Sequence, residues 1–372
     1  MRRLDALFLA RGSVRAVSVA RILLGLIVLW HLRPFLHEMQ AGVYYGDHFH
    51  RPFLPWLPTT SREVWYGVVG ATAVAGGLMA VGLYSRVATI ASFVLVSYGV
   101  AVDQLGFQHN RGLLVIVLAV MCLFPTGQVL SVDRWLRRRG GQAVSDQANL
   151  WPLWLMRLEC TVPYVASATS KIIDPDWWGG TVIWIRTLRH IERVEQHPLV
   201  PELIGDMLDQ RSFHFWAAKA VILAEYLIGL GYWSRRTRYL SIWTAMLFHL
   251  GIEMSAEVNV FSWLGIANTL FWVVPATRDR TLVLDVRLRR ARVLRFLVRW
   301  LDWLARFEVR EATDGPAITL IDRDGTRLVG PRAVRIVLSR LPVFFWFVYP
   351  TLWPGLAPAI DRAFGQRRGA AR

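Results

Sequence analysis

Cysteine is almost absent from this chain of 372 residues, which contains only Cys122 and Cys160. Both lie inside apolar stretches, and they are far apart in the sequence. Two isolated cysteines exclude a disulfide framework, a Cys-x-x-Cys redox motif and a zinc site made of thiolates. His48 and His50 stand beside Asp47, but these few ligands are weak evidence for a metal, and we predict no metal site.

Acidic residues are also scarce, because 27 Asp and Glu stand against 43 Lys and Arg, which gives a net charge of +16. Such an excess of positive charge is typical of nucleic-acid-binding proteins. Here, however, the basic residues gather in clusters that lie next to apolar stretches. The clusters are "MRRL" with Arg11, Arg15 and Arg21, "DRWLRRRGG", "SRRTR" and "RLRRARVLRFLVRW". We therefore predict that this charge faces anionic lipid headgroups, and that nucleic acid is not a partner.

Long apolar runs dominate the rest of the chain, which is 54% hydrophobic with a mean hydropathy of +0.34. A helix needs about 20 apolar residues to cross a bilayer. We predict an all-α polytopic membrane protein with about eight transmembrane helices. The predicted spans lie near residues 17–35, 64–84, 87–106, 110–125, 151–171, 213–233, 237–254 and 257–275. With a cytoplasmic N-terminus, this arrangement places every basic cluster and Arg86 on the cytoplasmic side, as the positive-inside rule requires.

The predicted localisation is the cell membrane, with several passes and with both termini in the cytoplasm. The first apolar run begins only near residue 17, and no small-residue cleavage site precedes the next polar loop, so we expect the first span to be retained. Residues 1–280 are predicted to form the membrane domain, and 281–372 a small α+β cytoplasmic tail. The longest outward segment, 172–212, contains "IWIRTLRHIERVEQ", which has the pattern of an amphipathic surface helix.

Three elements are predicted in the tail. A basic amphipathic helix covers roughly residues 284–306, and "FEVREATDGPAITLIDRDGTRLVG" follows it as a β-hairpin with its turn at "DRDG". The apolar piece "AVRIVLSRLPVFFWFVYPTLWPGL" is interrupted by two arginines and three prolines. We interpret it as a pair of interfacial helices, with a ninth span over 333–356 as the alternative.

The candidate site centres on the fifth predicted span. Arg157, Tyr164 and Lys171 are spaced by seven residues, which places them within about 40° on one helical face. Lys171 ends this face at the outer surface, about 21 Å from Arg157 along the helix. The simpler alternative is that Lys171 only extends its amine toward the lipid headgroups.

Other polar and ionisable residues that the topology does not explain fall on the same outer side. They are Asp103, Gln104, His109, Asn110 and Arg111 in a hairpin, His249 and Glu253 in the seventh span, and Glu257. Ionisable groups inside spans are costly and tend to face a cavity, so their clustering is a site hypothesis. The alternatives are an interhelical hydrogen bond for His249 and a helix cap for Asp174 and Asp176. Glu225 in the sixth span needs a partner, for which Arg157 and Lys219 are candidates.

Four blocks of the sequence resemble the membrane domain of the vitamin K-dependent γ-glutamyl carboxylases and their bacterial relatives, the HTTM (horizontally transferred transmembrane) proteins. The resemblance covers roughly residues 15–280. The blocks are "RILLGLIVLWHL", "FQHNRGLLVIVLAVMCLFPTGQVLSVDRW", "LWPLWLMRLECTVPYVASATSKIIDPDWWGG" and "LFHLGIEMSAEVNVFSWLGIA".

The resemblance implies a membrane enzyme with a lysine base. In the carboxylases a lysine of the third block is taken to deprotonate vitamin K hydroquinone, so the implied catalytic residues here are Lys171 and His249. An amine in apolar surroundings is more readily held neutral, as a general base must be. The implied substrate-binding residues are Asp103, His109, Asn110, Arg157, Tyr164 and Trp177. A reduced quinone is thus the cofactor that the resemblance suggests, and the sequence alone leaves the cofactor unknown.

The chain also departs from the carboxylases. A single lysine stands where they have two adjacent ones, "HN" replaces the order asparagine–histidine in the hairpin, and the large domain that grips the substrate propeptide is absent. The tail after residue 307 resembles the C-terminal half of a DCC-type thiol oxidoreductase domain without its cysteines, which implies no thiol chemistry there. The main hypothesis is therefore an enzyme acting on a quinone or another lipophilic substrate. The alternative is a non-catalytic membrane factor that binds, matures or exports a partner peptide, and a transporter ranks last because no inverted repeat is visible.

Overall fold

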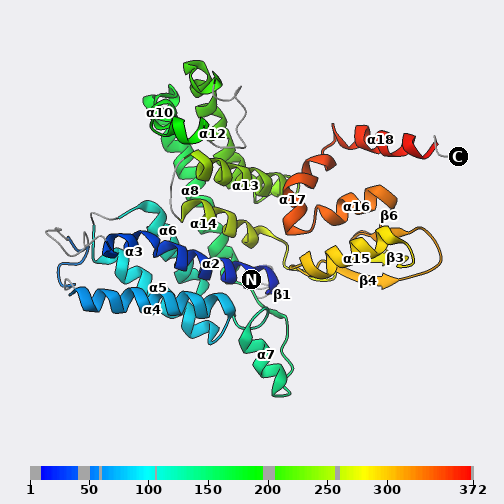
Figure 1. Ribbon diagram of the computed structural model, residues 1–372, viewed down its shortest axis with the longest axis horizontal. Coiled ribbons are helices and arrows are strands. Elements are labelled where there is room, and N and C mark those ends of the chain that lie inside the picture. Colours follow the sequence, from blue (N-terminus) through cyan, green and yellow to red (C-terminus); the bar gives the residue numbers. More distant parts are fainter. Residues whose placement is uncertain are drawn as a thin grey trace, which may run out of the picture. The chain divides into compact units, whose positions relative to one another are not determined.

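The computed structural model describes residues 10–40, 51–57, 61–104, 107–195, 206–255 and 260–369. Asp47, His48, His50 and Glu257, which the sequence analysis singled out, lie outside this part of the chain. The structure divides into two compact units, Met1–Val273 and Val274–Arg372 (Figure 1). The first unit is built of helices apart from one short pair of strands, and the second contains a small sheet.

Helices occupy all eight ranges that were predicted to span the membrane. They are α2 (Arg15–His31) with α3 (Arg33–Gln40), α4 (Arg62–Val81), α5 (Ser85–Ala101), α6 (His109–Met121), α8 (Pro152–Ile173), α12 (Arg211–Gly231), α13 (Arg238–Ser255), and α14 (Phe261–Asn268) with the 3₁₀ turn η2 (Thr269–Trp272). Between them lie α7 (Val132–Arg139), α9 (Pro175–Trp178), α10 (Thr181–Glu195) and strand β2 (Gln147–Asn149). Strand β1 (Arg11–Ser13) precedes α2 and pairs antiparallel with β2.

Not all of these helices have the length and composition of a membrane span. Among the described residues three do: Arg15–His37, Arg62–Val81 and Arg211–Gly231. Helices α5 and α6 are apolar but shorter, and the 13 residues of α6 extend only about 20 Å. Helix α8 has 22 residues, but it carries Arg157, Glu159 and Lys171, whose charges are costly in hydrocarbon. The structure therefore supports membrane helices without confirming the count of eight.

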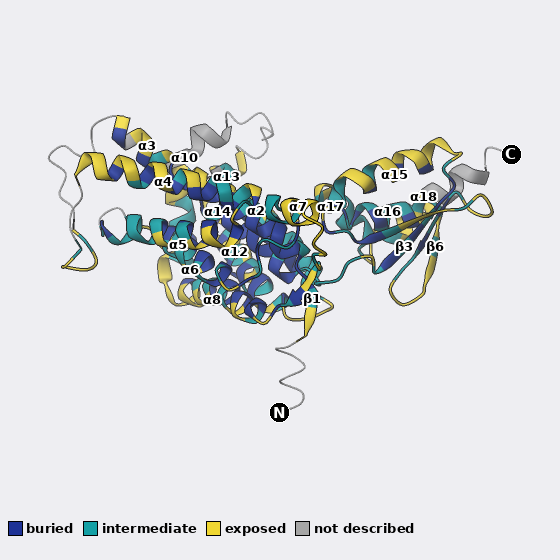
Figure 2. Cartoon of the chain, turned by 90° about the horizontal axis from the view of Figure 1, so that it is seen from below, coloured by how far each residue is buried: buried dark blue, intermediate teal, exposed yellow. Residues whose placement is uncertain are grey.

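Close packing in the first unit depends on small residues. Gly25 of α2 faces Gly76 and Ala80 of α4, and a Cβ atom at Gly25 would lie 2.6 Å from the backbone nitrogen of Ala80. Such contacts let two backbones approach closely, as is common between membrane helices. Apolar residues are buried between the helices, yet others are exposed, among them Val74, Val87 and Leu223. Figure 2 shows exposed residues along the outer sides of helices such as α4. Exposed apolar faces of this kind fit a surrounding of lipid rather than water.

A buried arginine organises the turn between α4 and α5. Arg21 of α2 is 0% exposed, and its guanidinium donates to the carbonyl of Leu130 (2.5 Å) and to the Ser85 hydroxyl (3.4 Å). Gly82 in this turn has φ +74°, and a Cβ atom there would overlap the Arg21 guanidinium. The carboxylate of Asp133, at the start of α7, accepts from the backbone N–H groups of Tyr84 (2.8 Å) and Ser85 (2.7 Å).

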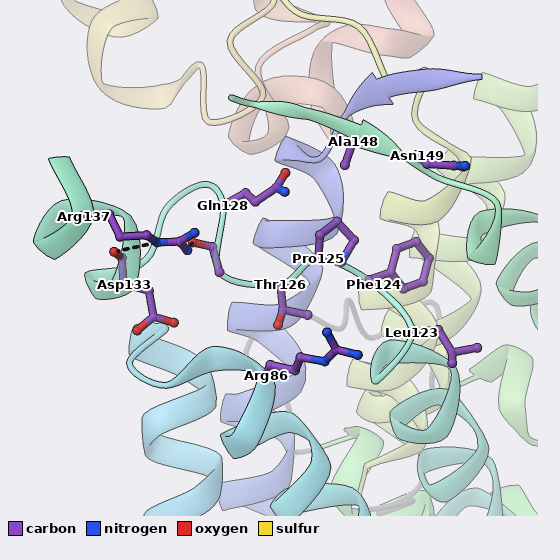
Figure 3. A pocket seen from close by; sticks show the side chains of 11 residues that line it. Arg86, Leu123, Phe124, Pro125, Thr126, Gln128, Asp133, Arg137, Ala148 and Asn149 are labelled. Atoms are coloured by element: carbon purple, nitrogen blue, oxygen red, sulfur yellow. Dashed lines mark hydrogen bonds between the residues drawn. The ribbon is translucent and has the colours of Figure 1, made fainter. Parts of the chain in front are cut away.

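Asp133 therefore caps the N-terminus of α5 from a distant part of the chain. It also lines a cavity of about 450 Å³ with Arg86, Thr126 and Arg137, as Figure 3 shows. In this cavity Arg137 donates to the backbone carbonyls of Gly127 (2.6 Å) and Asp133 (3.2 Å).

The second unit is a four-stranded sheet with helices. Its strand order is β4-β3-β5-β6, with β3 (Arg280–Leu284), β4 (Phe307–Glu311), β5 (Ile318–Ile321) and β6 (Arg327–Val329). Helix α15 (Arg289–Leu301) connects β3 to its parallel neighbour β4. After β6 come α16 (Gly330–Leu338), α17 (Pro342–Val348), the 3₁₀ turn η3 (Tyr349–Leu352) and α18 (Ala357–Gly369).

The predicted hairpin is found in part: β5 and β6 pair antiparallel on either side of residues 322–326, whereas its first residues, "FEVRE", form β4, which pairs parallel with β3. Strand β3 was missed: the basic helix was predicted to begin near residue 284, but it begins at Arg289, and β3 precedes it. The apolar piece after residue 332 is a helix pair bent by 118°. Ala333 and Val337 of this pair belong to the core of the second unit, with Leu284, Leu294 and Leu320.

Candidate functional site

Helix α8 presents the three residues that the spacing of seven placed on one face. Arg157, Tyr164 and Lys171 are all buried, at 9%, 9% and 8% exposed, while Leu158 and Ile172 on other faces are exposed. The predicted shared face is therefore the face that packs against the other helices. Helix α12 lies along it, and Gly229 of α12 permits the approach, since a Cβ atom there would be 2.9 Å from Val165.

Lys171 forms an ion pair with Glu225 of α12. Its Nζ atom lies 2.6 Å from Oε1 and 2.7 Å from Oε2 of the carboxylate, and both side chains are buried. Ser167, one turn before Lys171, accepts from the amine (2.5 Å) and donates to Glu225 Oε1 (3.0 Å). The three side chains thus form a closed network in which every link is a hydrogen bond to a charged group.

This pairing corrects two expectations. Glu225 does not pair with Arg157 or Lys219, because Lys171 occupies both of its oxygens. Lys219 instead donates to the Trp178 carbonyl. Lys171 is also not an isolated amine in apolar surroundings, since the charge of a carboxylate balances its own.

Trp177 covers the amine. The Nζ atom of Lys171 lies 4.7 Å from the centre of the Trp177 ring, and the Arg186 guanidinium lies 5.5 Å from the same ring. Asp174 holds this tryptophan in place as the N-cap of α9, because its carboxylate accepts from the backbone N–H groups of Asp176 (2.9 Å) and Trp177 (3.3 Å). The capping role proposed for Asp174 is therefore what the structure shows.

His249 of α13 contacts the same face of α8 through Tyr164. The Tyr164 hydroxyl lies 2.6 Å from His249 Nε2, and the histidine is 1% exposed. Gly265 of α14 leaves room for the ring, since a Cβ atom at this position would lie 2.0 Å from Nε2. His249 Nδ1 has no hydrogen-bond partner within the described part of the chain. The structure thus shows the interhelical hydrogen bond that was the simpler interpretation for His249. This bond uses Nε2 and leaves Nδ1 available.

Arg157 has a different environment. Its Nε donates to the backbone carbonyl of Phe271 (3.0 Å), and its guanidinium lies over the rings of Trp154 (5.6 Å) and Trp272 (5.3 Å). Cation–π contacts and a carbonyl partner satisfy a buried guanidinium without a carboxylate. These contacts belong to the packing of α8 against η2.

The hairpin residues are held by another part of the first unit. Asp103 is buried, the side chain of Asn110 accepts from the Arg111 backbone N–H (2.9 Å), and the exposed His109 stacks edge-on against Phe107. The Arg111 guanidinium lies 4.8 Å from the ring of Phe35 in α3. Arg111 of this hairpin thus contacts α3, whereas Lys171 contacts α9 and α12.

The predicted residues therefore fall into separate groups. The structure brings Lys171 together with Trp177 and, in a neighbouring contact, Tyr164 with His249. The sequence analysis did not single out Ser167, and it did not recognise Glu225 as the partner of Lys171. Ser167 could have been found, because it lies four residues before Lys171 and therefore on the same helical face.

These features define a class: an α-helical membrane protein with a buried ion pair and a buried tyrosine–histidine pair among apolar helices. Within this class, the family model of the HTTM domain matches residues 13–276, which is more than half of the chain. The protein thus belongs to the HTTM family, a membrane protein family related to the vitamin K-dependent carboxylases. No curated protein and no solved structure matches the chain in the same comparisons.

Proposed function

We propose that the membrane domain is an enzyme in which Lys171 and Glu225 act as an acid–base pair on a lipid-soluble hydroxyl compound. The observation that carries this proposal is the Lys171–Glu225–Ser167 network, buried among apolar helices and covered by the ring of Trp177. A paired lysine and carboxylate in low-dielectric surroundings are typical of sites that move protons.

The network can take up a proton from a bound hydroxyl compound while the site and the substrate together stay neutral. Lys171 passes one ammonium proton to Glu225, directly or through the Ser167 hydroxyl, and becomes a neutral amine. The amine then accepts the hydroxyl proton of the substrate, and the positive charge of the pair balances the negative charge left on the substrate oxygen. A reduced quinone fits this arrangement because its flat ring can lie against Trp177. When bound, it would supply redox chemistry that the side chains lack.

The alternative is that the protein is a non-catalytic membrane factor for a partner peptide. The observation in its favour is that Glu225 and Ser167 already bond the Lys171 amine. The Lys171–Glu225 ion pair therefore also holds α8 against α12. In that case the ion pair contributes to the fold alone, and any balanced replacement of the pair should preserve function.

The chain offers a clean test, because Lys171 and Lys219 are its only lysines. The protein in lipid nanodiscs is given reduced vitamin K or a short-chain hydroquinone, and binding and oxidation are followed by fluorescence and chromatography. Lys171→Met and Glu225→Gln should lower turnover by at least about 100-fold, the lower range for loss of an acid–base group. Lys219→Met is the matched control and should retain turnover. Binding and turnover that persist in a folded Lys171→Met/Glu225→Leu variant would overturn the enzyme proposal.

We also propose that the eight predicted spans cross the bilayer, with both termini in the cytoplasm. The support is the agreement between the eight helical ranges and the four basic clusters on one side. In a background with Cys122 and Cys160 replaced by alanine, Gly140→Cys and Asp176→Cys should react with an impermeant maleimide from opposite sides. Labelling of both from the same side would contradict this topology.

A further inference from the structure

Helix α15 has two apolar faces, and the fold uses only one of them. Ala291, Leu294 and Val298 lie on one side and are buried in the core of the second unit. Val293, Phe296 and Trp300 lie on the opposite side and are 51%, 61% and 62% exposed. Their spacing of three and four residues makes a continuous stripe along the helix. Figure 2 shows that exposed residues follow the outer side of α15, away from β3.

Arginines flank this stripe. Successive positions of an α-helix are 100° apart, which places Arg292, Arg295 and Arg299 along one edge and Arg290 on the other. Arg295 pairs with Glu311 at 2.7 Å, whereas Arg292 and Arg299 have no ion-pair partner among the described residues. An apolar, aromatic stripe between cationic edges is the pattern of helices that lie in the interface of an anionic membrane.

The position of α15 in the chain keeps it near a bilayer. The HTTM match ends at residue 276, and α15 begins at Arg289. The 13 residues from 276 to 289 span at most about 45 Å when fully extended, and β3 shortens this reach. A surface tethered so closely meets the membrane at a high effective concentration, so even a modest affinity keeps it bound.

We propose that the stripe Val293–Phe296–Trp300 of α15 inserts into the headgroup layer of the membrane in which the protein resides, and that Arg292 and Arg299 bind anionic phospholipid headgroups there. The cytoplasmic tail is thereby held flat on the bilayer through the face of α15 that its own core leaves uncovered. This surface is separate from the Lys171 network, and it does not depend on the enzyme proposal.

A spin label can test the insertion in the full-length protein. In the cysteine-free background, Val293→Cys carries the label, and the protein is placed in nanodiscs of phosphatidylcholine with or without phosphatidylglycerol. With phosphatidylglycerol, the label should collide more often with oxygen, which concentrates in lipid, than with a water-soluble nickel chelate. Asp324→Cys, in the exposed turn between β5 and β6, is the matched control and should keep the collision ratio of a label in water.

Two sets of variants separate the contribution of the apolar stripe from that of the arginines. Phe296→Ser with Trp300→Ser should return the label at 293 to the ratio of the control, because the apolar anchor is lost. Arg292→Gln and Arg299→Gln should each weaken docking about fivefold in nanodiscs with phosphatidylglycerol and have little effect without it. The proposal is overturned if the label at 293 matches the control in both lipids. It is equally overturned if the label is immobilised with no gain in oxygen collisions, which would indicate a protein partner or a second copy.

Discussion

Two of the buried charge clusters in the first unit, those around Lys171 and Arg21, are built on different principles. Around Lys171, a side-chain ammonium faces a side-chain carboxylate and a hydroxyl. Around Arg21, the guanidinium donates to the backbone carbonyl of Leu130 and to the hydroxyl of Ser85. The nearby carboxylate of Asp133 is likewise satisfied by backbone N–H groups.

The difference indicates which cluster can carry chemistry. The Arg21 guanidinium, bonded to one backbone carbonyl and one hydroxyl, is a poor proton donor and ties α2 to the residues around Leu130 and Ser85. A lysine beside a carboxylate is a donor–acceptor pair between which a proton can pass without a change in net charge, and the proposed function uses this property. We therefore assign a structural role to the Arg21 cluster and keep the functional proposal for Lys171.

The largest expected effect comes from breaking the ion pair on one side. Lys171→Met leaves the carboxylate of Glu225 buried without a cation, which should lower the free energy of unfolding by about 3–5 kcal/mol. Thermal unfolding of the detergent-solubilised protein measures this change.

The double variant Lys171→Met/Glu225→Leu separates stability from function. It replaces the buried pair by apolar side chains, and its stability should return to within about 1 kcal/mol of the parent or exceed it. Turnover should stay lost if Lys171 is the base. A double variant as unstable as Lys171→Met would show that Glu225 is not the group left uncompensated.

The second largest loss of stability is expected from a substitution in the Arg21 cluster. Gly82→Ala adds a Cβ atom at φ +74° where the Arg21 guanidinium lies. Left-handed backbone strain and overlap together should cost about 2–4 kcal/mol in the free energy of unfolding. Gly77→Ala in α4 is the matched control, because a Cβ atom there would meet no other element of the described chain within 4 Å. Equal stability of the two variants would mean that the turn does not need glycine.

The sequence predicts the helices and their buried faces better than it predicts the number of membrane spans. The helices were predictable because apolar runs and loop composition mark them locally, as for α4 and α12. The shared face of Arg157, Tyr164 and Lys171 followed from helical geometry alone. The number of spans stays a prediction, because the hydropathy of a stretch does not fix where its helix ends: α6 ends at Met121, four residues before the end of the predicted range 110–125.

The partner of Glu225 could not be predicted for another reason. Lys171 and Glu225 are 54 positions apart, and their contact depends on which helix lies beside α8 and how α12 is rotated about its axis. The tail shows the same limit, since the parallel pairing of β3 with β4 is set by tertiary structure around α15. The "DRDG" hairpin was predictable because its pairing is local.

A smaller loss of stability is expected from a substitution of Asp133, which lies beside the Arg21 cluster. Asp133→Asn replaces one of the two oxygens that cap α5 by an NH₂ group, which cannot accept from a backbone N–H. It also removes a negative charge at the N-terminus of a helix. Together these changes should cost about 1–2 kcal/mol, less than Gly82→Ala, in the same thermal unfolding measurement. A loss above that of Gly82→Ala would show that Asp133 holds more than the cap.

The smallest effect is expected for an ion pair of the tail, whose arginine is exposed. Arg287 bonds Asp285 at 2.9 and 3.0 Å and holds the pKa of that carboxyl below its ordinary value of 3.8, chiefly through the side-chain hydrogen bond. Because the pKa is lower in the folded state, the pair stabilises the tail above about pH 4, and this contribution is lost as the pH falls through the folded pKa. Arg287→Gln removes the largest cause of the shift. Pepsin cleavage of the tail, compared between parent and variant at each pH, should show the parent as the more resistant at about pH 4–5, with the difference vanishing toward pH 2. A difference of the same size at every pH would come from the bond between Arg287 and the Thr313 carbonyl, which does not titrate, and would contradict a contribution from the Asp285 pair.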